Sequence, residues 1–221
     1  MKRILLALTA SGLALAAAAP ASAAIFIGVS INGGPITQVA VDGGTGSVNY
    51  NTTNNGFFFN TNGTGFPLVL QPNLLTQSVN IGSAGNGGTI SIYITQTDLS
   101  AFTGALASTF TSNTISNASV ALSTYFSAAN ALFGGTLLQS SSFTGSGTGG
   151  GINTLALNLP FSETVRYDIT FGAGSGNFNG TANLTTAVPE PATWGLMILG
   201  FAGLGYTVRR RPKTTARVRF A

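Results

Sequence analysis

The 221-residue sequence contains no cysteine and no histidine. Disulfides, zinc–thiolate centres and thiol catalysis are therefore excluded, and a serine nucleophile has no histidine to activate its hydroxyl. Charged residues make up only 6% of the chain, against roughly 25% in an ordinary soluble domain. Glycine, threonine, serine and asparagine replace the missing charge, so the chain is too apolar to be a disordered polyelectrolyte.

The few charges are concentrated at the two ends of the chain. The formal net charge is +4, but Lys2 and Arg3 lie at the start and six basic residues lie among the last thirteen. Between Ala24 and Val188 a single base, Arg166, stands against four acids, so this part has a net charge of about −3. Phosphate contacts require clustered lysine and arginine, which argues against nucleic-acid binding by this part. The four acids are Asp42, Asp98, Glu163 and Asp168.

The N-terminus has the three parts of a secretory signal peptide. Met1-Lys2-Arg3 is basic, residues 4–19 form an apolar run, and Ala21 and Ala23 provide an Ala-x-Ala cleavage site. Residues 1–23 are therefore predicted to be a signal peptide that is cleaved after Ala23. An uncleaved membrane anchor is the alternative, and the short, alanine-rich apolar run argues against it.

A second apolar run, Trp194 to Val208, is followed directly by Arg209, Arg210 and Arg211. It is slightly shorter than the roughly 20 residues that span a bilayer as a helix, but arginine side chains can snorkel and recover some length. We therefore expect a C-terminal single-pass transmembrane helix. The positive-inside rule places the arginines in the cytoplasm and the preceding part of the chain outside it. A buried core helix, the alternative, would not explain the terminal position and the arginine run.

The residues around this run resemble the PEP-CTERM sorting signal. Pro189-Glu190-Pro191 is followed by Trp194, an apolar span and the arginine run, in the order that the signal has. The tryptophan form is similar to the alphaproteobacterial variant, although Gly195 stands where alanine is more usual. The resemblance covers residues 188–212. The same tail is also catalogued as an ice-binding-protein C-terminal motif, a label that does not establish ice binding.

The resemblance implies a partner and a route. Proteins with this signal are thought to be recognised at Pro-Glu-Pro by a membrane-embedded exosortase, cleaved nearby, and released or transferred to the cell surface. Pro189, Glu190, Pro191 and Trp194 would then be recognition residues without a catalytic role. Because prolines fix φ and remove donors, the tripeptide is predicted to be extended and separate from the following helix. Residues 213–221 are predicted to form a basic cytoplasmic tail.

Residues 24–187 have the pattern of an all-β domain. Apolar and polar residues alternate in segments of strand length, most clearly in Ile90–Thr95 and Val165–Phe171. Clusters of turn-forming residues separate these segments at near-regular intervals, which predicts an antiparallel β-sandwich. Further candidate strands are 25–31, 36–41 and 154–159, and the turn clusters begin at Asn32, Asp42, Asn62, Asn86 and Asn179.

Four segments leave alternatives open. Residues 98–110 have helical spacing of apolar residues but poor helix composition, so helix and strand are equally compatible, and strand is favoured for residues 119–133. Phe57-Phe58-Phe59 is expected in the buried core, with an exposed sugar-stacking surface as the alternative. Residues 145–150 formally match G-x-G-x-x-G, but no helix follows to bind a phosphate, so a flexible loop is expected.

Catalytic and metal-binding patterns are scarce in residues 24–187. A glycosidase needs two carboxylates in one cleft, and only the four acids are candidates. Arg166 and Asp168 are two residues apart on the polar face of one predicted strand, so a surface ion pair between them is the simplest interpretation. Glu163 lies just before that strand. Asp42 precedes two glycines, but the alternating acidic ligands of a calcium loop are missing. We therefore expect no catalytic residue, no metal and no cofactor.

These observations predict a non-catalytic, exported protein of the cell envelope or extracellular matrix. Its expected partners are the membrane and an exosortase-type processing enzyme. The resemblance to PEP-CTERM proteins implies exopolysaccharide as a further partner. A carbohydrate-binding or adhesive surface module is the alternative, suggested by 15 phenylalanines and abundant asparagine and threonine. A glycosidase is a remote third hypothesis.

Overall fold

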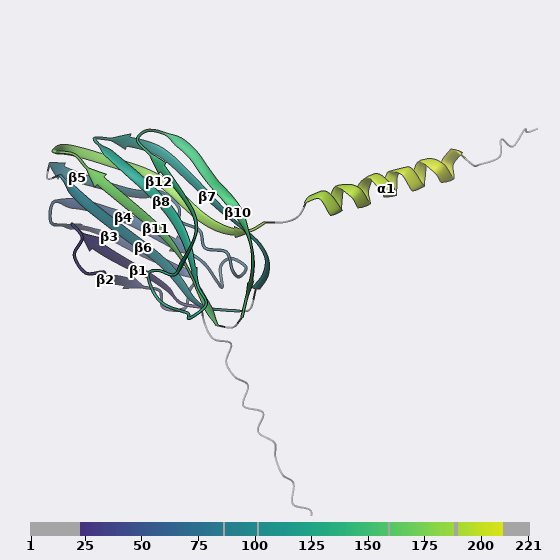
Figure 1. The fold of residues 1–221 in the computed structure, drawn as a ribbon, viewed down its shortest axis with the longest axis horizontal. Helices are drawn as coiled ribbons and strands as arrows, with labels where there is room; N and C mark the ends of the chain where they lie inside the picture. The colour runs from purple at the N-terminus through teal and green to yellow at the C-terminus, as the bar shows by residue number, and fades with distance from the viewer. Residues whose placement is uncertain (1–22, 86, 101, 159, 188–189, 210–221) are drawn as a thin grey trace, which may run out of the picture.

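Two six-stranded sheets pack face to face in the computed structural model (Figure 1). The structure describes residues 23–85, 87–100, 102–158, 160–187 and 190–209. Sheet A consists of β1 (Ile25–Ile31), β2 (Thr37–Val41), β6 (Gly88–Leu99), β8 (Ala118–Ser127), β9 (Thr136–Phe143) and β11 (Phe161–Phe171). Sheet B consists of β3 (Ser47–Asn54), β4 (Phe57–Thr64), β5 (Val79–Gly85), β7 (Phe102–Ser116), β10 (Gly147–Leu157) and β12 (Gly174–Thr186).

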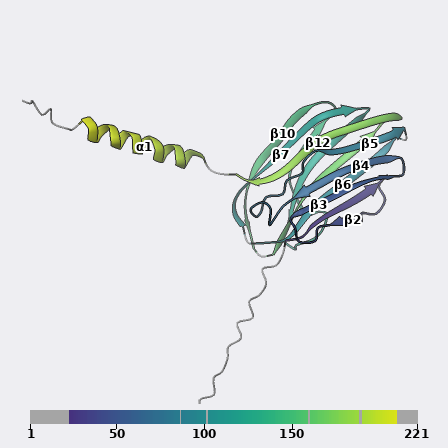
Figure 2. The ribbon, with the colours of Figure 1, turned by 180° about the vertical axis from the view of Figure 1, so that it is seen from behind.

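The spatial order of the strands is β2-β1-β6-β11-β8-β9 in sheet A and β10-β7-β12-β5-β4-β3 in sheet B. Figure 2 shows the sandwich from behind, where β10, β7, β12, β5 and β4 follow one another across one layer. Neighbouring strands are antiparallel in both sheets. The predicted antiparallel β-sandwich is therefore confirmed.

The core lies between the sheets because alternate residues of each strand face inward. On β11, Val165, Tyr167 and Ile169 are fully buried, whereas Arg166 and Asp168 between them face outward. Sheet B contributes the same pattern through its own apolar residues. Burying one large apolar side chain contributes about 1.5–3 kcal/mol relative to leaving it exposed. Most of the inward-facing apolar residues of the two sheets form one continuous cluster, and a second, smaller cluster consists of Ala23, Leu99, Leu157 and Phe161.

Two of the five predicted turns are confirmed, two others are strand residues, and Asn86 of the fifth lies outside the described residues. Asn32 (φ 53°) and Gly33 (φ 72°) connect β1 to β2, and residues 42–46 connect β2 to β3. Asn62-Gly63 lies within β4, where a Cβ on Gly63 would be 2.7 Å from a methyl carbon of Ile94 on the opposite sheet. Asn179-Gly180 lies within β12 at a register shift. In these two strands the glycine allows close packing or a β-bulge. The Asn-Gly dipeptide alone does not distinguish these uses from a turn.

The two segments with helix or strand alternatives are mainly strand. Residues 98–99 end β6, all of residues 102–110 belong to β7, and residues 118–127 form β8, so the strand favoured for residues 119–133 ends at Ser127. The predicted flexible loop at 145–150 is wrong, because β10 begins at Gly147. A Cβ on Gly149 would lie 2.4 Å from the Ser141 Oγ, and one on Gly151 would lie 2.5 Å from the Gln139 Nε2. The glycines therefore allow β10 to approach β9 of the other sheet closely.

A helix, α1 (Glu190–Arg209), follows the sandwich (Figure 1). The prediction of an extended tripeptide is wrong at its end, because Pro191 falls in the first turn of α1, where a missing N–H breaks no helical hydrogen bond. Among the described residues, no helix is both long and apolar enough to cross a membrane. The expected transmembrane helix is therefore not confirmed at α1, whose four glycines and terminal arginine lower its apolar character.

Candidate functional site

Two of the four candidate carboxylates hold loops in place. Asp42 is buried, and its two oxygens accept hydrogen bonds from the backbone N–H of Ile25 (2.8 Å) and of Gly46 (2.9 Å). Asp98 accepts from the Asn130 amide (2.8 Å), and its own N–H donates to that residue's side-chain oxygen (2.9 Å). Both carboxylates therefore have structural partners, and neither faces another acid in these contacts.

Asp168 forms the predicted surface ion pair with Arg166 on the outer face of sheet A. The Arg166 Nη2 lies 2.8 Å from Asp168 Oδ1, its Nε donates to the same oxygen (2.9 Å), and the Ser91 hydroxyl donates to it as well (2.5 Å). The guanidinium also lies 5.1 Å from the ring centroid of Tyr93. Partial burial alone would lower the pKa of Arg166, but the hydrogen bond and charge of Asp168 raise it. The prediction of a surface ion pair is confirmed.

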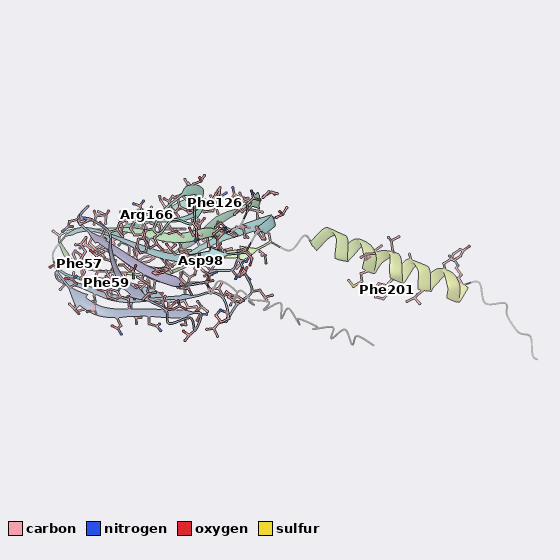
Figure 3. The ribbon with its side chains drawn as sticks, turned by 90° about the horizontal axis from the view of Figure 1, so that it is seen from below. Phe57, Phe59, Asp98, Phe126, Arg166 and Phe201 are labelled. Atoms are coloured by element: carbon pink, nitrogen blue, oxygen red, sulfur yellow. The ribbon has the colours of Figure 1, made fainter. Side chains whose placement is uncertain are left out.

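Glu163 lies inside the sandwich, within β11 rather than before it as predicted. It is 0% exposed, and neither carboxyl oxygen has a hydrogen-bond partner among the described residues. Its register neighbours are Gln96 on β6 and Phe126 on β8 (Figure 3 labels Phe126). The Gln96 Nε2 is likewise buried without a partner, although its Oε1 accepts from the Phe66 N–H (3.0 Å). Desolvation by burial raises the pKa of Glu163 well above its ordinary value.

Glu163 and Asp168 cannot form a glycosidase pair. Glu163 and Asp168 are five residues apart on one strand, so their side chains project from opposite faces of sheet A. Asp98 lies toward the end of the sandwich from which the chain leaves for α1 (Figure 3). Within the described part of the chain, no group of three or more acidic, histidine or cysteine residues could hold a metal ion.

The phenylalanine triplet divides between core and surface. Phe57 and Phe59 are 1% exposed and belong to the core, whereas Phe58 between them is 51% exposed on the outer face of sheet B. The alternation of β4 explains this difference, because neighbouring residues of a strand face opposite sides. The core prediction therefore holds for Phe57 and Phe59, whereas Phe58 is exposed.

The predicted processing residues flank the sandwich in the sequence. Ala23 is fully buried against Leu99 and Phe161, and the Ala24 carbonyl accepts from the Thr97 N–H (3.0 Å). Glu190 begins α1, which includes Pro191 and Trp194 and ends at Arg209. Predicted residues outside the described part of the chain are Ala21, Pro189, Arg210 and Arg211.

A family model described as the PEP-CTERM protein-sorting motif matches residues 187–211. The chain carries a PEP-CTERM sorting motif. The resemblance found around Pro189-Glu190-Pro191 is thus confirmed, and the β-sandwich lies outside the matched residues. No curated protein matches the chain. The solved structure of TmCBM61 in complex with beta-1,4-galactotriose is similar at 14% identity and a TM-score of 0.33, over 50% of this chain and 70% of that one.

Proposed function

We propose that this chain is an exported, non-catalytic protein of the cell surface or extracellular matrix, delivered by a PEP-CTERM/exosortase-type system. The observation that carries the proposal is that the sorting motif begins directly after the last strand of the sandwich. The last strand, β12, ends at Thr186, and the sorting motif begins at residue 187. Cleavage near Pro-Glu-Pro would therefore leave the β-sandwich whole.

The surface of α1 supports association with the membrane before processing. Five of its large apolar side chains are between 64% and 72% exposed, which is unfavourable in water and favourable beside lipid. The arginine run that follows fits the cytoplasmic side of a membrane. These five side chains are Leu196, Ile198, Leu199, Phe201 and Leu204; Figure 3 shows Phe201 on the helix, away from the sandwich.

The described side chains support a body without catalysis. Asp42, Asp98 and Asp168 already have partners, and Glu163 is enclosed in the core. Since neither histidine nor cysteine occurs in the sequence, the reactive groups that most hydrolases and transferases use are missing. We therefore propose a structural or binding role at the cell surface, with exopolysaccharide as partner.

Replacing Pro189-Glu190-Pro191 by three alanines in the native host tests the sorting step. We expect the variant to accumulate uncleaved in the membrane fraction, while the wild type is processed. Pro212→Ala is the matched control, because it removes a proline just beyond the matched residues. Equal processing of the triple variant and the wild type would rule out recognition at the tripeptide.

A further inference from the structure

Sheet B has no charged residue in any of its six strands. The five charged side chains of residues 24–187 all belong to sheet A or to the turn that follows β2. Solvated sheet faces usually carry lysine and glutamate, so an uncharged outer face on one sheet of an exported domain is unusual. The polarity of this face comes instead from amides and hydroxyls.

The amides form a row that crosses four strands. Asn51 on β3 pairs with Asn60 on β4, which pairs with Asn80 on β5, which pairs with Asn179 on β12. Residues in direct register share a face, so the four side chains line up across the sheet. Adjacent strands are about 4.8 Å apart, so the row extends over about 14 Å. The Asn113 amide extends it by donating to the Asn179 side-chain oxygen (3.0 Å).

The next row along the strands contains the exposed aromatic ring. Phe58 pairs with Gly82 on β5, which pairs with Asn177 on β12. A Cβ on Gly82 would lie 3.4 Å from the Phe58 Cδ2, so the ring rests against a position without a side chain. The Asn177 amide donates to the Asn80 side-chain oxygen (2.8 Å), which joins the two rows.

The two rows enclose a shallow hollow of about 280 Å³. Because Gly82 has no side chain, the floor of the hollow is low beside Phe58. The walls that matter for recognition are the ring and the surrounding amides and hydroxyl: Asn51, Thr53, Phe58, Asn60, Asn80 and Asn177. An amide offers both donor and acceptor, and an aromatic ring offers an apolar face.

We infer that this hollow binds a neutral polysaccharide chain. The inference rests on the proposed surface function and names the ligand class for it. Sugar hydroxyls match the donor–acceptor amides, and the C–H face of a sugar ring matches Phe58. An acidic polysaccharide would require lysine or arginine here, and the negative net charge of residues 24–187 would oppose its approach. The row of about 14 Å has room for about two to three sugar rings.

Affinity electrophoresis of the exported protein tests this assignment, using gels that contain dextran, mannan, xyloglucan or, as the acidic comparison, alginate. We expect at least one neutral polymer to retard the wild type. Phe58→Ala and Asn60→Ala should each weaken that interaction about tenfold or more. Ile152→Ala is the matched control and should not change it, because Ile152 is a 66%-exposed apolar side chain of sheet B on β10, outside the hollow. Thermal unfolding confirms that each variant is folded.

The inference would be overturned if none of the three neutral polymers retarded the wild type, or if only alginate did. It would also be overturned if Phe58→Ala and Asn60→Ala were both retarded as strongly as the wild type. Concentration-dependent self-association that Phe58→Ala abolishes, without glycan binding, would assign the face to a second copy of the chain and overturn it as well. The proposed function is tested separately, by whether the tail is cleaved. If the tail is cleaved but no neutral polysaccharide binds, only the inferred ligand class is refuted, and the proposed function stands.

Discussion

The buried carboxyl of Glu163 makes the stability of the sandwich depend on pH. Its pKa is raised in the folded chain because burial disfavours the charged form, while an unfolded glutamate titrates near about 4.3. The associated stability is therefore fully present below about pH 4.3 and falls as pH rises from there through the folded pKa. One proton that is held in the folded state and lost from the unfolded state costs about 1.4 kcal/mol per pH unit across this window.

Glu163→Gln removes this dependence without changing the size of the side chain. Urea unfolding of wild type and variant between pH 4 and pH 8 gives the difference in their free energies of unfolding. We expect that difference to be constant below about pH 4.3 and then to grow in favour of glutamine by about 1.4 kcal/mol per pH unit. The difference between Glu163→Met and the wild type should change with pH by the same amount per unit, because methionine also has no titratable carboxyl. Its absolute value should differ from that of Glu163→Gln. Parallel curves for wild type and both variants would refute the buried, neutral carboxyl.

Three further substitutions test the packing. Asp42→Ala leaves two buried backbone N–H groups without an acceptor and should lower the free energy of unfolding by about 3 kcal/mol; a loss below about 1 kcal/mol in urea unfolding would contradict its anchoring role. Gly150→Ala should cost at least about 2 kcal/mol, because φ is +136° and the new Cβ would lie 2.0 Å from the Ser108 carbonyl oxygen, whereas Gly145→Ala, with open space around it, should be nearly neutral in the same assay. Arg166→Ala should cost less than about 1 kcal/mol by thermal unfolding, since its ion pair is partly exposed; a larger cost would show that the pair anchors β11.

The fold class could be predicted because its signal is local. Alternation in Val165–Phe171 requires only neighbouring residues, and it identified the strand and the outward-facing Arg166–Asp168 pair. The sorting motif is equally local, since its tripeptide, apolar run and arginines are contiguous. Extending the same alternation two residues toward the N-terminus would have placed Glu163 on the buried face.

Features that depend on the opposite sheet could not be predicted in this way. The glycines at 149 and 151 look like a flexible loop until β9 is placed beside them. Asn62-Gly63 resembles a turn, whereas the actual turn between β3 and β4 is Asn55-Gly56, with φ of 50° and 78°. Both pairs have the same composition, and only the packing around Gly63 separates them.

The amide row is the strongest case of a feature hidden in the sequence. Asn80 and Asn177 are 97 residues apart, yet their side chains form a hydrogen bond. Because β12 joins β3, β4 and β5 from a distant part of the chain, the members of the row follow no fixed period. Strand order and register create the alignment, and neither can be derived from composition.

The mass of the intact protein isolated from its native host tests the account most directly. Export and sorting predict a chain that begins at Ala24 and ends near Pro191, just beyond β12, with most of α1 removed. A protein that retains its first 23 residues or the whole of α1 would contradict delivery by this route.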